Sequence, residues 1–302
     1  MRRVSACLIA ATVTAVCCGC GSVHTPTKVS AKDRRIAKDS TKEELLGKYN
    51  SYAESVKSLN ATVELKATTG SKYSSVIDEY HEVKVFMLAE RPERIRMVGQ
   101  APVIGKTVFD MASDGETFRI SIPTKNKFIV GKTAVERTSE KPIENLRPQH
   151  LVDALLWPTV HKAEAVLFEE FNDENARYYV LTVLRGGYEA EILRKIWFDR
   201  GDLQVARIQA YGTKGALVSD VHFANWQPVI GDQEHASGTT ANGSSAFPMA
   251  MRIERPHEDY KLDLQVAKVA LNQELDAERF KLQQPAGSEL VQVGEATEKK
   301  QP

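Results

Sequence analysis

Apolar and polar residues alternate along Ala61-Thr62-Val63-Glu64-Leu65-Lys66-Ala67 (ATVELKA). Successive side chains of an extended strand point to opposite faces of a sheet, so a period of two predicts a strand with one buried face and one solvated face. The same period returns in three further stretches, 83–87, 95–97 and 118–122. The chain is therefore predicted to fold mainly as β-sheet.

Short turn sequences separate these stretches, at 90–93, 113–115 and 123–126. Such short connections predict antiparallel hairpins, because a parallel pair needs a crossover of about a dozen residues or more. Alternation or dense apolar character predicts seven more strands, which brings the total to about eleven. These later strands are expected at 165–171, 177–185, 189–199, 202–212, 215–226, 247–255 and 259–271.

Two helices are predicted beside the strands. Thr41-Lys42-Glu43-Glu44 is a capping-box pattern that begins the first helix, whose apolar residues recur at spacings of three and four. The second helix covers 148–158, with a proline at each end. The fold class is thus mainly β with a helical cap (α+β).

The N-terminus reads as a secretory signal. Arg2 and Arg3 precede an uncharged run, and small residues surround Cys20. The run is too short to cross a bilayer, which takes about 20 apolar residues. A signal that ends in cysteine resembles the bacterial lipoprotein lipobox, and this resemblance implies that Cys20 carries acyl chains such as palmitate. Cys18 is the alternative lipidated residue, and an ordinary signal peptide cut elsewhere is the alternative to lipidation.

These features divide the chain into a lipoprotein signal peptide (1–19), a flexible tether (20–39), one folded domain (40–292) and a disordered tail (293–302). Within the domain, the low-complexity stretch 231–246 is expected to be a mobile loop.

The composition and motifs argue against several classes of function. Lys plus Arg equals Asp plus Glu at 40 each, so no global field attracts nucleic acid. No nucleophile-elbow, zinc-protease or phosphate-loop motif occurs in the sequence, so we expect no enzyme, no cofactor and no metal. Arg200 lies in an Arg-Gly-Asp tripeptide, which is read as a hairpin turn between two strands.

The order of one helix, a strand meander, an inserted helix and further strands resembles the LolA/LolB superfamily of lipoprotein carriers. Three segments carry the resemblance: 94–105, with its Pro102-Val103-Ile104-Gly105 loop, the helix at 148–158, and 275–287, which is similar to a closing Phe-x-x-x-x-Pro-x-Gly signature. The resemblance is closest to the membrane-anchored LolB type. It implies an open antiparallel half-barrel whose helices cap an apolar hollow.

The resemblance also implies a function and a place. The chain would be anchored through Cys20 to the outer membrane of a bacterial envelope and would face the periplasm. The outer membrane is favoured because Gly21 and Ser22 do not match an inner-membrane retention signal. It would bind lipid or lipoprotein acyl chains, received from a periplasmic carrier protein, and help to insert them. The alternative is an envelope-stress sensor or assembly lipoprotein that binds a protein partner with the same fold, as in the RseB-like branch.

Two groups of candidate site residues follow. Val103 and Ile104 form a candidate membrane-contact loop, and the open alternative is a hairpin turn packed into the core. The second group comprises candidate residues of the cavity or its cap, and the open alternative is a sheet that fills its interior with its own side chains. This group is Tyr49, Tyr52, Phe118, Ile120, Leu151, Leu155 and Trp157. Cargo identity and oligomeric state are not determined by the sequence.

Overall fold

The computed structural model describes residues 36–71, 76–133, 147–173, 176–187, 189–229 and 245–293. From residue 37 onward they belong to one compact unit. The predicted signal peptide, most of the tether, the mobile loop up to residue 244 and the tail from residue 294 lie outside the described residues.

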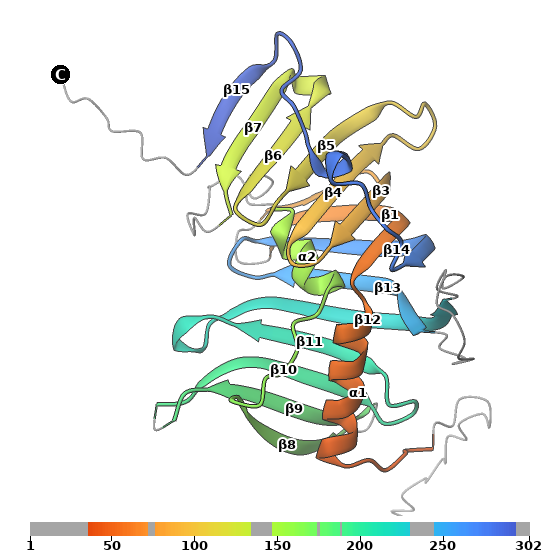
Figure 1. The fold of residues 1–302 in the computed structure, drawn as a ribbon, viewed down its shortest axis with the longest axis vertical. Helices are drawn as coiled ribbons and strands as arrows, with labels where there is room; N and C mark the ends of the chain where they lie inside the picture. The colour runs from red at the N-terminus through yellow and green to blue at the C-terminus, as the bar shows by residue number, and fades with distance from the viewer. Residues whose placement is uncertain are drawn as a thin grey trace, which may run out of the picture. The chain divides into compact units, whose positions relative to one another are not determined.

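The described elements, in chain order, are two α-helices and fifteen strands (Figure 1). They are α1 (Lys42–Ser55), β1 (Ser58–Ser71), β2 (Val76–Glu79), β3 (Val83–Glu90), β4 (Arg94–Gln100), β5 (Thr107–Ser113), β6 (Thr117–Ile122), β7 (Lys127–Lys132), α2 (Gln149–Leu155), β8 (Ala165–Asn172), β9 (Arg177–Arg185), β10 (Glu191–Asp199), β11 (Val205–Tyr211), β12 (Leu217–Val229), β13 (Ser245–Arg255), β14 (Tyr260–Leu271) and β15 (Glu289–Val293), with short 3-10 turns including η5 (Ala277–Phe280).

All the strands belong to one open sheet in the order β15-β7-β6-β5-β4-β3-β1-β14-β13-β12-β11-β10-β9-β8, with β2 paired to β1. The strand that contains the stretch 61–67, β1, lies at the middle of this order, where it pairs antiparallel with β14 on one side and with β3 on the other. The predicted open, mainly antiparallel sheet with a helical cap is therefore confirmed.

The sheet differs from the prediction in two respects. It has strands that the sequence did not reveal, namely β2, β5, β7 and β15. It also contains a parallel pair, because β15 lies parallel to β7. β15 reaches this position after a long C-terminal segment, and a pairing between strands so far apart in sequence leaves no turn signal between them.

The alternation in the sequence gives the sheet two distinct faces. We call the face that carries Val63, Met97 and Leu264 the inner face, because these residues belong to the main core cluster. The opposite face, which carries Glu64 and Arg96, is the outer face. In β4 the alternation is complete, with every second residue buried.

α1 covers the inner face of one half of the sheet and crosses in front of β8 to β12 (Figure 1). Its predicted capping box is present: Thr41 Oγ1 accepts a hydrogen bond from the Glu44 amide, and Glu44 accepts one from the Thr41 amide. Leu45, Tyr49 and Ala53 are its buried residues. The helix is thus fixed at its start by local bonds and along its length by burial.

α2 is shorter than the predicted helix at 148–158, since it ends at Leu155. Leu156 has left the helical region, with φ −117° and ψ 76°. Pro158 explains the early end, because a residue before proline is driven out of the helical conformation and Trp157 holds that position. Trp157 is consequently presented on an extended segment and not on the helix.

The segment 272–288, which we call the C-terminal segment, crosses the outer face of the other half, in front of β3 to β5 (Figure 1). Phe280 packs there in a small buried cluster with Leu88 and Leu275. Arg96 donates hydrogen bonds to the carbonyls of Arg279 (3.1 Å) and Lys281 (2.6 Å). The predicted closing signature is therefore a structural element that leads the chain to β15.

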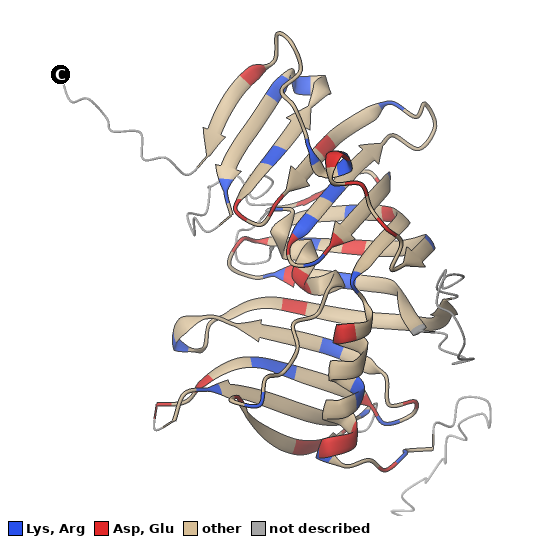
Figure 2. Cartoon of the chain, in the orientation of Figure 1, with Lys and Arg blue, Asp and Glu red and all other residues tan. Residues whose placement is uncertain are grey.

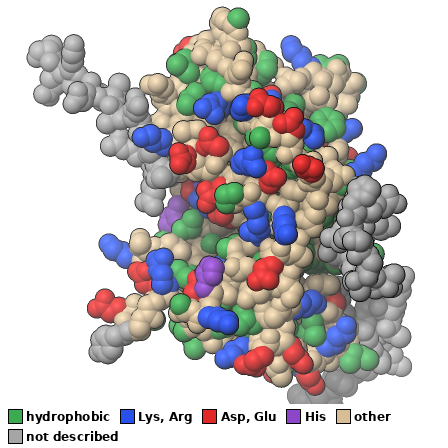
Figure 3. Space-filling view, in the orientation of Figure 1, with side chains coloured by type: hydrophobic (Ala, Val, Ile, Leu, Met, Phe, Trp, Pro, Cys, Tyr) green, Lys and Arg blue, Asp and Glu red, His purple; other side chains and the backbone are tan. Residues whose placement is uncertain are grey.

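Charges of both signs are interspersed along the ribbon, as the balanced composition predicts (Figure 2). In the space-filling view, apolar side chains lie among charged ones over the visible face (Figure 3).

Candidate functional site

The candidate site is the inner-face cover, which we define as α1 together with residues 156–160. Trp157 lies at its centre and is 1% exposed. Its ring stacks on Tyr49, with centroids 5.5 Å apart and planes 11° apart, and it contacts Tyr52 at 4.3 Å. An aromatic cluster thus joins the two parts of the cover.

Hydrogen bonds also join the two parts. Tyr49 donates its hydroxyl to the Pro158 carbonyl at 2.9 Å. Asn50 donates to the Val160 carbonyl at 3.0 Å and accepts from the Val160 amide at 2.8 Å. Burial raises the pKa of Tyr49 to about 12, so this phenol keeps its proton. The cover is therefore one bonded unit, although its parts are far apart in sequence.

Aromatic side chains of β12 contact this cover from the sheet. Trp157 contacts Phe223 at 5.0 Å and Trp226 at 6.0 Å, in edge-on geometries, and Tyr52 contacts Trp226 at 5.6 Å. Edge-on aromatic pairs are each worth about 0.5–1.5 kcal/mol beyond the area that they bury. These ring contacts form the apolar part of the interface between cover and sheet.

Two arginines supply polar contacts between sheet and cover. Arg91, just after β3, donates to the carbonyls of Ala53 (2.7 Å), Val56 (2.9 Å) and Trp157 (2.8 Å). Arg194, on β10, donates to the carbonyls of two further cover residues, Pro158 at 3.1 Å and Thr159 at 3.3 Å. Burial lowers the pKa of Arg91 from its ordinary value, but a guanidinium remains charged at physiological pH. Arg91 thus ties the end of α1 to the Trp157 segment.

The predicted cavity or cap residues come together in the main core cluster. Tyr52 is partly buried against that cluster, and the other six are buried, with exposed fractions of at most 9%. Only Tyr49, Tyr52 and Trp157 belong to the cover, while Phe118 and Ile120 lie on β6 in the other half of the sheet. In this conformation the chain's own side chains pack the space under the cover, which corresponds to the second of the two alternatives raised by the sequence.

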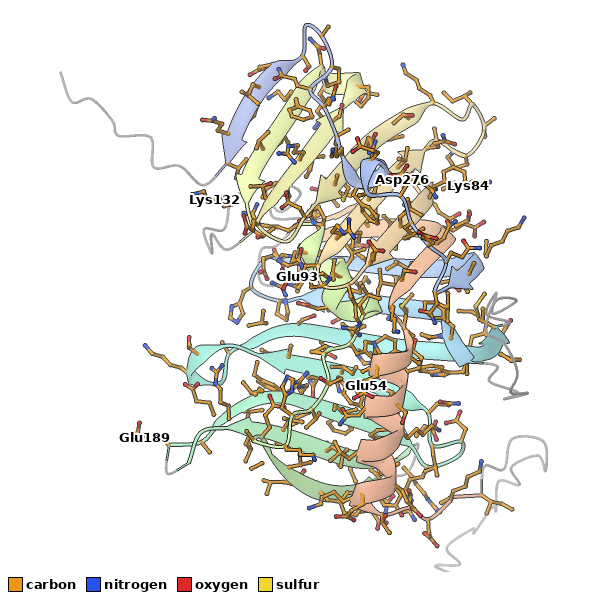
Figure 4. All side chains as sticks on the ribbon, viewed as in Figure 1. Glu54, Lys84, Glu93, Lys132, Glu189 and Asp276 are labelled. Atoms are coloured by element: carbon orange, nitrogen blue, oxygen red, sulfur yellow. The ribbon has the colours of Figure 1, made fainter. Side chains whose placement is uncertain are left out.

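A cleft of about 640 Å³ opens at the end of α1. It is bordered by Ala53, Glu54, Lys57, Glu90 and Arg91, together with Thr159 and residues 272–274. Figure 4 labels Glu54, on the last turn of α1. Arg91 lines this cleft and also bonds to Trp157, so the cleft lies beside the Trp157 segment.

The loop 101–106, between β4 and β5, presents two apolar side chains to solvent. Val103 is 95% exposed and Ile104 is 73% exposed. The loop itself is ordered by backbone bonds, from the Ala101 amide to the Lys106 carbonyl at 2.9 Å and from the Gly105 amide to the Ala101 carbonyl at 3.0 Å. Gly105 has φ +62°, which glycine adopts without strain. The alternative that this loop packs into the core is therefore wrong.

The Arg-Gly-Asp tripeptide is a turn between β10 and β11, as predicted, but its arginine has a role that the sequence did not reveal. Arg200 is 8% exposed and lies 4.5 Å from the Tyr179 ring centroid. It also pairs with Glu170 and, at 3.0 Å, with Asp39. Arg200 thus holds the residues just before α1 against the sheet, a contact between chain segments too distant for any local pattern to indicate.

Within the described part of the chain, no helix is long and apolar enough to cross a membrane. Over the same residues there is no group of three or more His, Cys, Asp or Glu side chains that could hold a metal ion.

Neither a protein-family model nor a curated protein sequence matches the chain. Solved structures are similar to it at low sequence identity. A LolA superfamily protein from Nitrosomonas europaea has 12% identity and a TM-score of 0.48, over 81% of this chain and 99% of that one. A DUF1329 family protein from Desulfovibrio piger has 13% identity and a TM-score of 0.49, over 79% of this chain and 95% of that one. The similarity concerns the fold, and the LolB type stays a prediction.

Proposed function

We propose that this chain is a lipid-anchored envelope protein that binds lipid or lipoprotein acyl chains between the inner face of its sheet and the cover, and that it helps to pass them to a membrane. The observation that carries the proposal is the cover itself. The cover buries a large aromatic cluster against the sheet. Its hydrogen bonds to the sheet come from side chains such as Arg91 and Arg194.

The free energy gained by burying an acyl chain is similar to the free energy lost by exposing the aromatic cluster. This similarity supports an exchange in which an acyl chain takes the place of the cover's aromatic rings. An acyl chain of about 15 methylenes gains about 0.8 kcal/mol for each one buried, or roughly 12 kcal/mol in total. Lifting Trp157 and a neighbouring ring exposes roughly 400 Å², which costs about 10 kcal/mol at 25 cal/mol per Å². An entering chain can thus replace the aromatic cluster, and departure of the chain lets the cluster close again.

The exposed loop fits the transfer step. Val103 and Ile104 are the apolar pair at its tip, and such a pair gains free energy on entering a bilayer. Lipidation of Cys20 would keep the domain close to that membrane and is proposed on the sequence resemblance alone.

The proposal is tested with the full mature chain and a fluorescent fatty-acid analogue. Arg91→Gln removes bonds that hold the cover, so the open population should rise roughly five- to a hundredfold, the equivalent of about 1–3 kcal/mol, and the probe should bind faster. Arg252→Gln, on the outer face, is the matched control. Absence of probe binding to either protein would refute the acyl-chain proposal.

The membrane step has its own test. Ile104→Glu should reduce binding to vesicles and transfer of the probe into them without changing the stability of the fold, since the side chain is exposed. Val291→Glu is not a suitable control, because Val291 lies on β15 and its substitution would disturb the pairing of β15 with β7. Lys106→Gln, at an exposed position on the same loop, changes the net charge by the same −1 and controls for charge alone. Unchanged vesicle binding by Ile104→Glu would remove this loop from the proposal.

A protein-binding sensor or assembly role is the second candidate, and the strand β8 favours it. β8 is the last strand of the sheet, and Leu167, Phe168 and Phe171 on it are 52%, 39% and 43% exposed. A long apolar edge strand is a template for a partner strand. Protein purified from membranes separates the roles by mass spectrometry of extracted material: bound lipid supports the carrier, whereas a co-purifying protein with no lipid supports the sensor.

A further inference from the structure

A buried cluster of hydrogen-bond donors lies around the start of α2, away from the cover. It comprises Arg147, just before the helix, His150 in its first turn, and Arg255 and Tyr260 at the facing ends of β13 and β14. Arg147, Arg255 and Tyr260 are 6%, 8% and 5% exposed. Figure 4 shows α2 in this region, beside the labelled Glu93.

The two guanidinium groups each have a donor without a partner. Arg147 lies 4.7 Å from the Phe118 ring centroid, and its buried Nη1 donates to no acceptor among the described residues. Arg255 bonds through Nη2 to Glu258 at 2.6 Å, yet within the same part of the chain its buried Nε also lacks an acceptor. A buried donor left without an acceptor costs about 1–3 kcal/mol, and more when it is charged.

The hydrogen bonds of His150 leave a third donor free. Arg255 Nη2 lies 3.1 Å from His150 Nε2 and can only donate, so Nε2 is the unprotonated acceptor. The proton of the neutral ring is therefore on Nδ1, which donates to the Tyr260 oxygen at 2.5 Å. The Tyr260 hydroxyl proton consequently remains available for another acceptor.

The protonation states support this assignment. Burial, followed by the charges of Arg255 and Arg147, lowers the pKa of His150 to about 2, so the ring is neutral. Burial raises the pKa of Tyr260, so the phenol keeps its proton. The carboxylate of Glu258 pairs with Arg255, and the carboxyl group of Asp153 on α2 also interacts with Arg255, while burial raises the pKa of Asp153.

We infer that Arg147, Arg255 and Tyr260 form a binding site for a phosphate group. Three buried donors without acceptors, two of them on guanidinium groups, favour an anionic ligand, and a phosphate offers three acceptor oxygens where a carboxylate offers two. The group can be inorganic phosphate or the head group of an amphiphile. A head group as the source of the phosphate rests on the proposed function. It is consistent with α2, which buries Leu151 and Leu155 in the core next to this site.

The test is a calorimetric titration of the full mature chain with inorganic phosphate, at constant ionic strength, and separately with dihexanoylphosphatidic acid and with dihexanoylglycerol. Binding of inorganic phosphate identifies a free-phosphate site. Binding of the phosphatidic acid alone identifies a head-group site. If neither phosphate compound binds, the inference is wrong. It is also wrong if inorganic phosphate does not bind and dihexanoylglycerol binds as well as the phosphatidic acid.

Variants locate the site. Arg147→Gln should weaken binding at least about tenfold, because it removes a charged donor, and Tyr260→Phe should weaken it about three- to tenfold while keeping the ring that packs in the core. Arg252→Gln, on the same strand as Arg255 but on the outer face, should bind as the wild type does. Equal loss in all three variants, or none in Arg147→Gln, would overturn the assignment. The inorganic phosphate arm needs no acyl chain, so its result is independent of the fatty-acid experiment.

Discussion

α1 and the C-terminal segment each cover one half of the same sheet, and they are attached to it in different ways. The cover over β8 to β12 meets the inner face through aromatic rings and is tied to it by Arg91 and Arg194. The C-terminal segment lies on the outer face between two paired strands, β14 before it and β15 after it. α1 is joined directly to a paired strand only at its C-terminal end, where β1 begins, whereas the C-terminal segment has a paired strand at each end.

In each half of the sheet, one arginine donates hydrogen bonds to backbone carbonyls of the segment that covers that half. Arg91 donates to backbone carbonyls of the cover, and Arg96 donates to carbonyls of the C-terminal segment while Asp110 holds its other side at 2.6 Å. The comparison suggests that the half under α1 is the adjustable one and that the half under the C-terminal segment is a rigid frame.

The largest expected effect is that of Trp157→Ala. Removing this ring empties the centre of the aromatic cluster, and truncation of a buried aromatic residue costs about 3–5 kcal/mol. Urea unfolding of the purified chain should show this loss. Trp197→Ala, at a partly buried position on the outer face, is the matched control and should cost less. Equal losses would mean that Trp157 is not the centre of the cover.

Phe280→Ala should have the next largest effect. Phe280 is 7% exposed but belongs to a cluster of only three buried residues, so a loss of about 2–4 kcal/mol is expected. Hydrogen exchange should then increase in β15 and β7 and remain unchanged in α1. A uniform increase across both halves would contradict the idea that the two coverings are independent.

The two arginines provide the sharpest comparison. Arg91→Gln and Arg96→Gln should each destabilise the fold by about 1–3 kcal/mol. Arg91→Gln leaves partly buried carbonyls without a charged donor, and Arg96→Gln leaves the partly buried Asp110 carboxylate without its ion-pair partner. Their hydrogen-exchange patterns should differ, with faster exchange in α1 for Arg91→Gln and in residues 277–293 for Arg96→Gln. If Arg96→Gln also accelerated fatty-acid binding, the division into an adjustable half and a frame would fail.

The smallest expected effect belongs to the start of the cover. Thr41→Ala removes one side of the capping box, which costs about 1 kcal/mol. Thr41→Ser keeps the hydroxyl and should restore most of the stability. Thermal unfolding followed by circular dichroism measures both variants, and an unchanged midpoint in Thr41→Ala would show that α1 is held by burial alone.

Much of this fold was predictable from short-range patterns. The alternation in β1 and β4, the capping box at Thr41 and the hairpin turn at Arg200 all confirm what neighbouring residues indicate. The predictions fell short where distant segments meet, as for the parallel pairing of β15 with β7. The end of α2 before Trp157 was also missed, although the local effect of Pro158 explains it.

The candidate site shows the same division. The helical spacing of Tyr49 and Tyr52 could be read from the sequence, because periodicity is a local property of the chain, whereas the position of Trp157 on an extended segment was missed. Only the tertiary structure decided that they meet in one cluster under a shared set of arginine bonds, and that Arg147, Arg255 and Tyr260 come together. Side-chain partners separated by a hundred residues depend on the path of the whole chain, which no local pattern encodes.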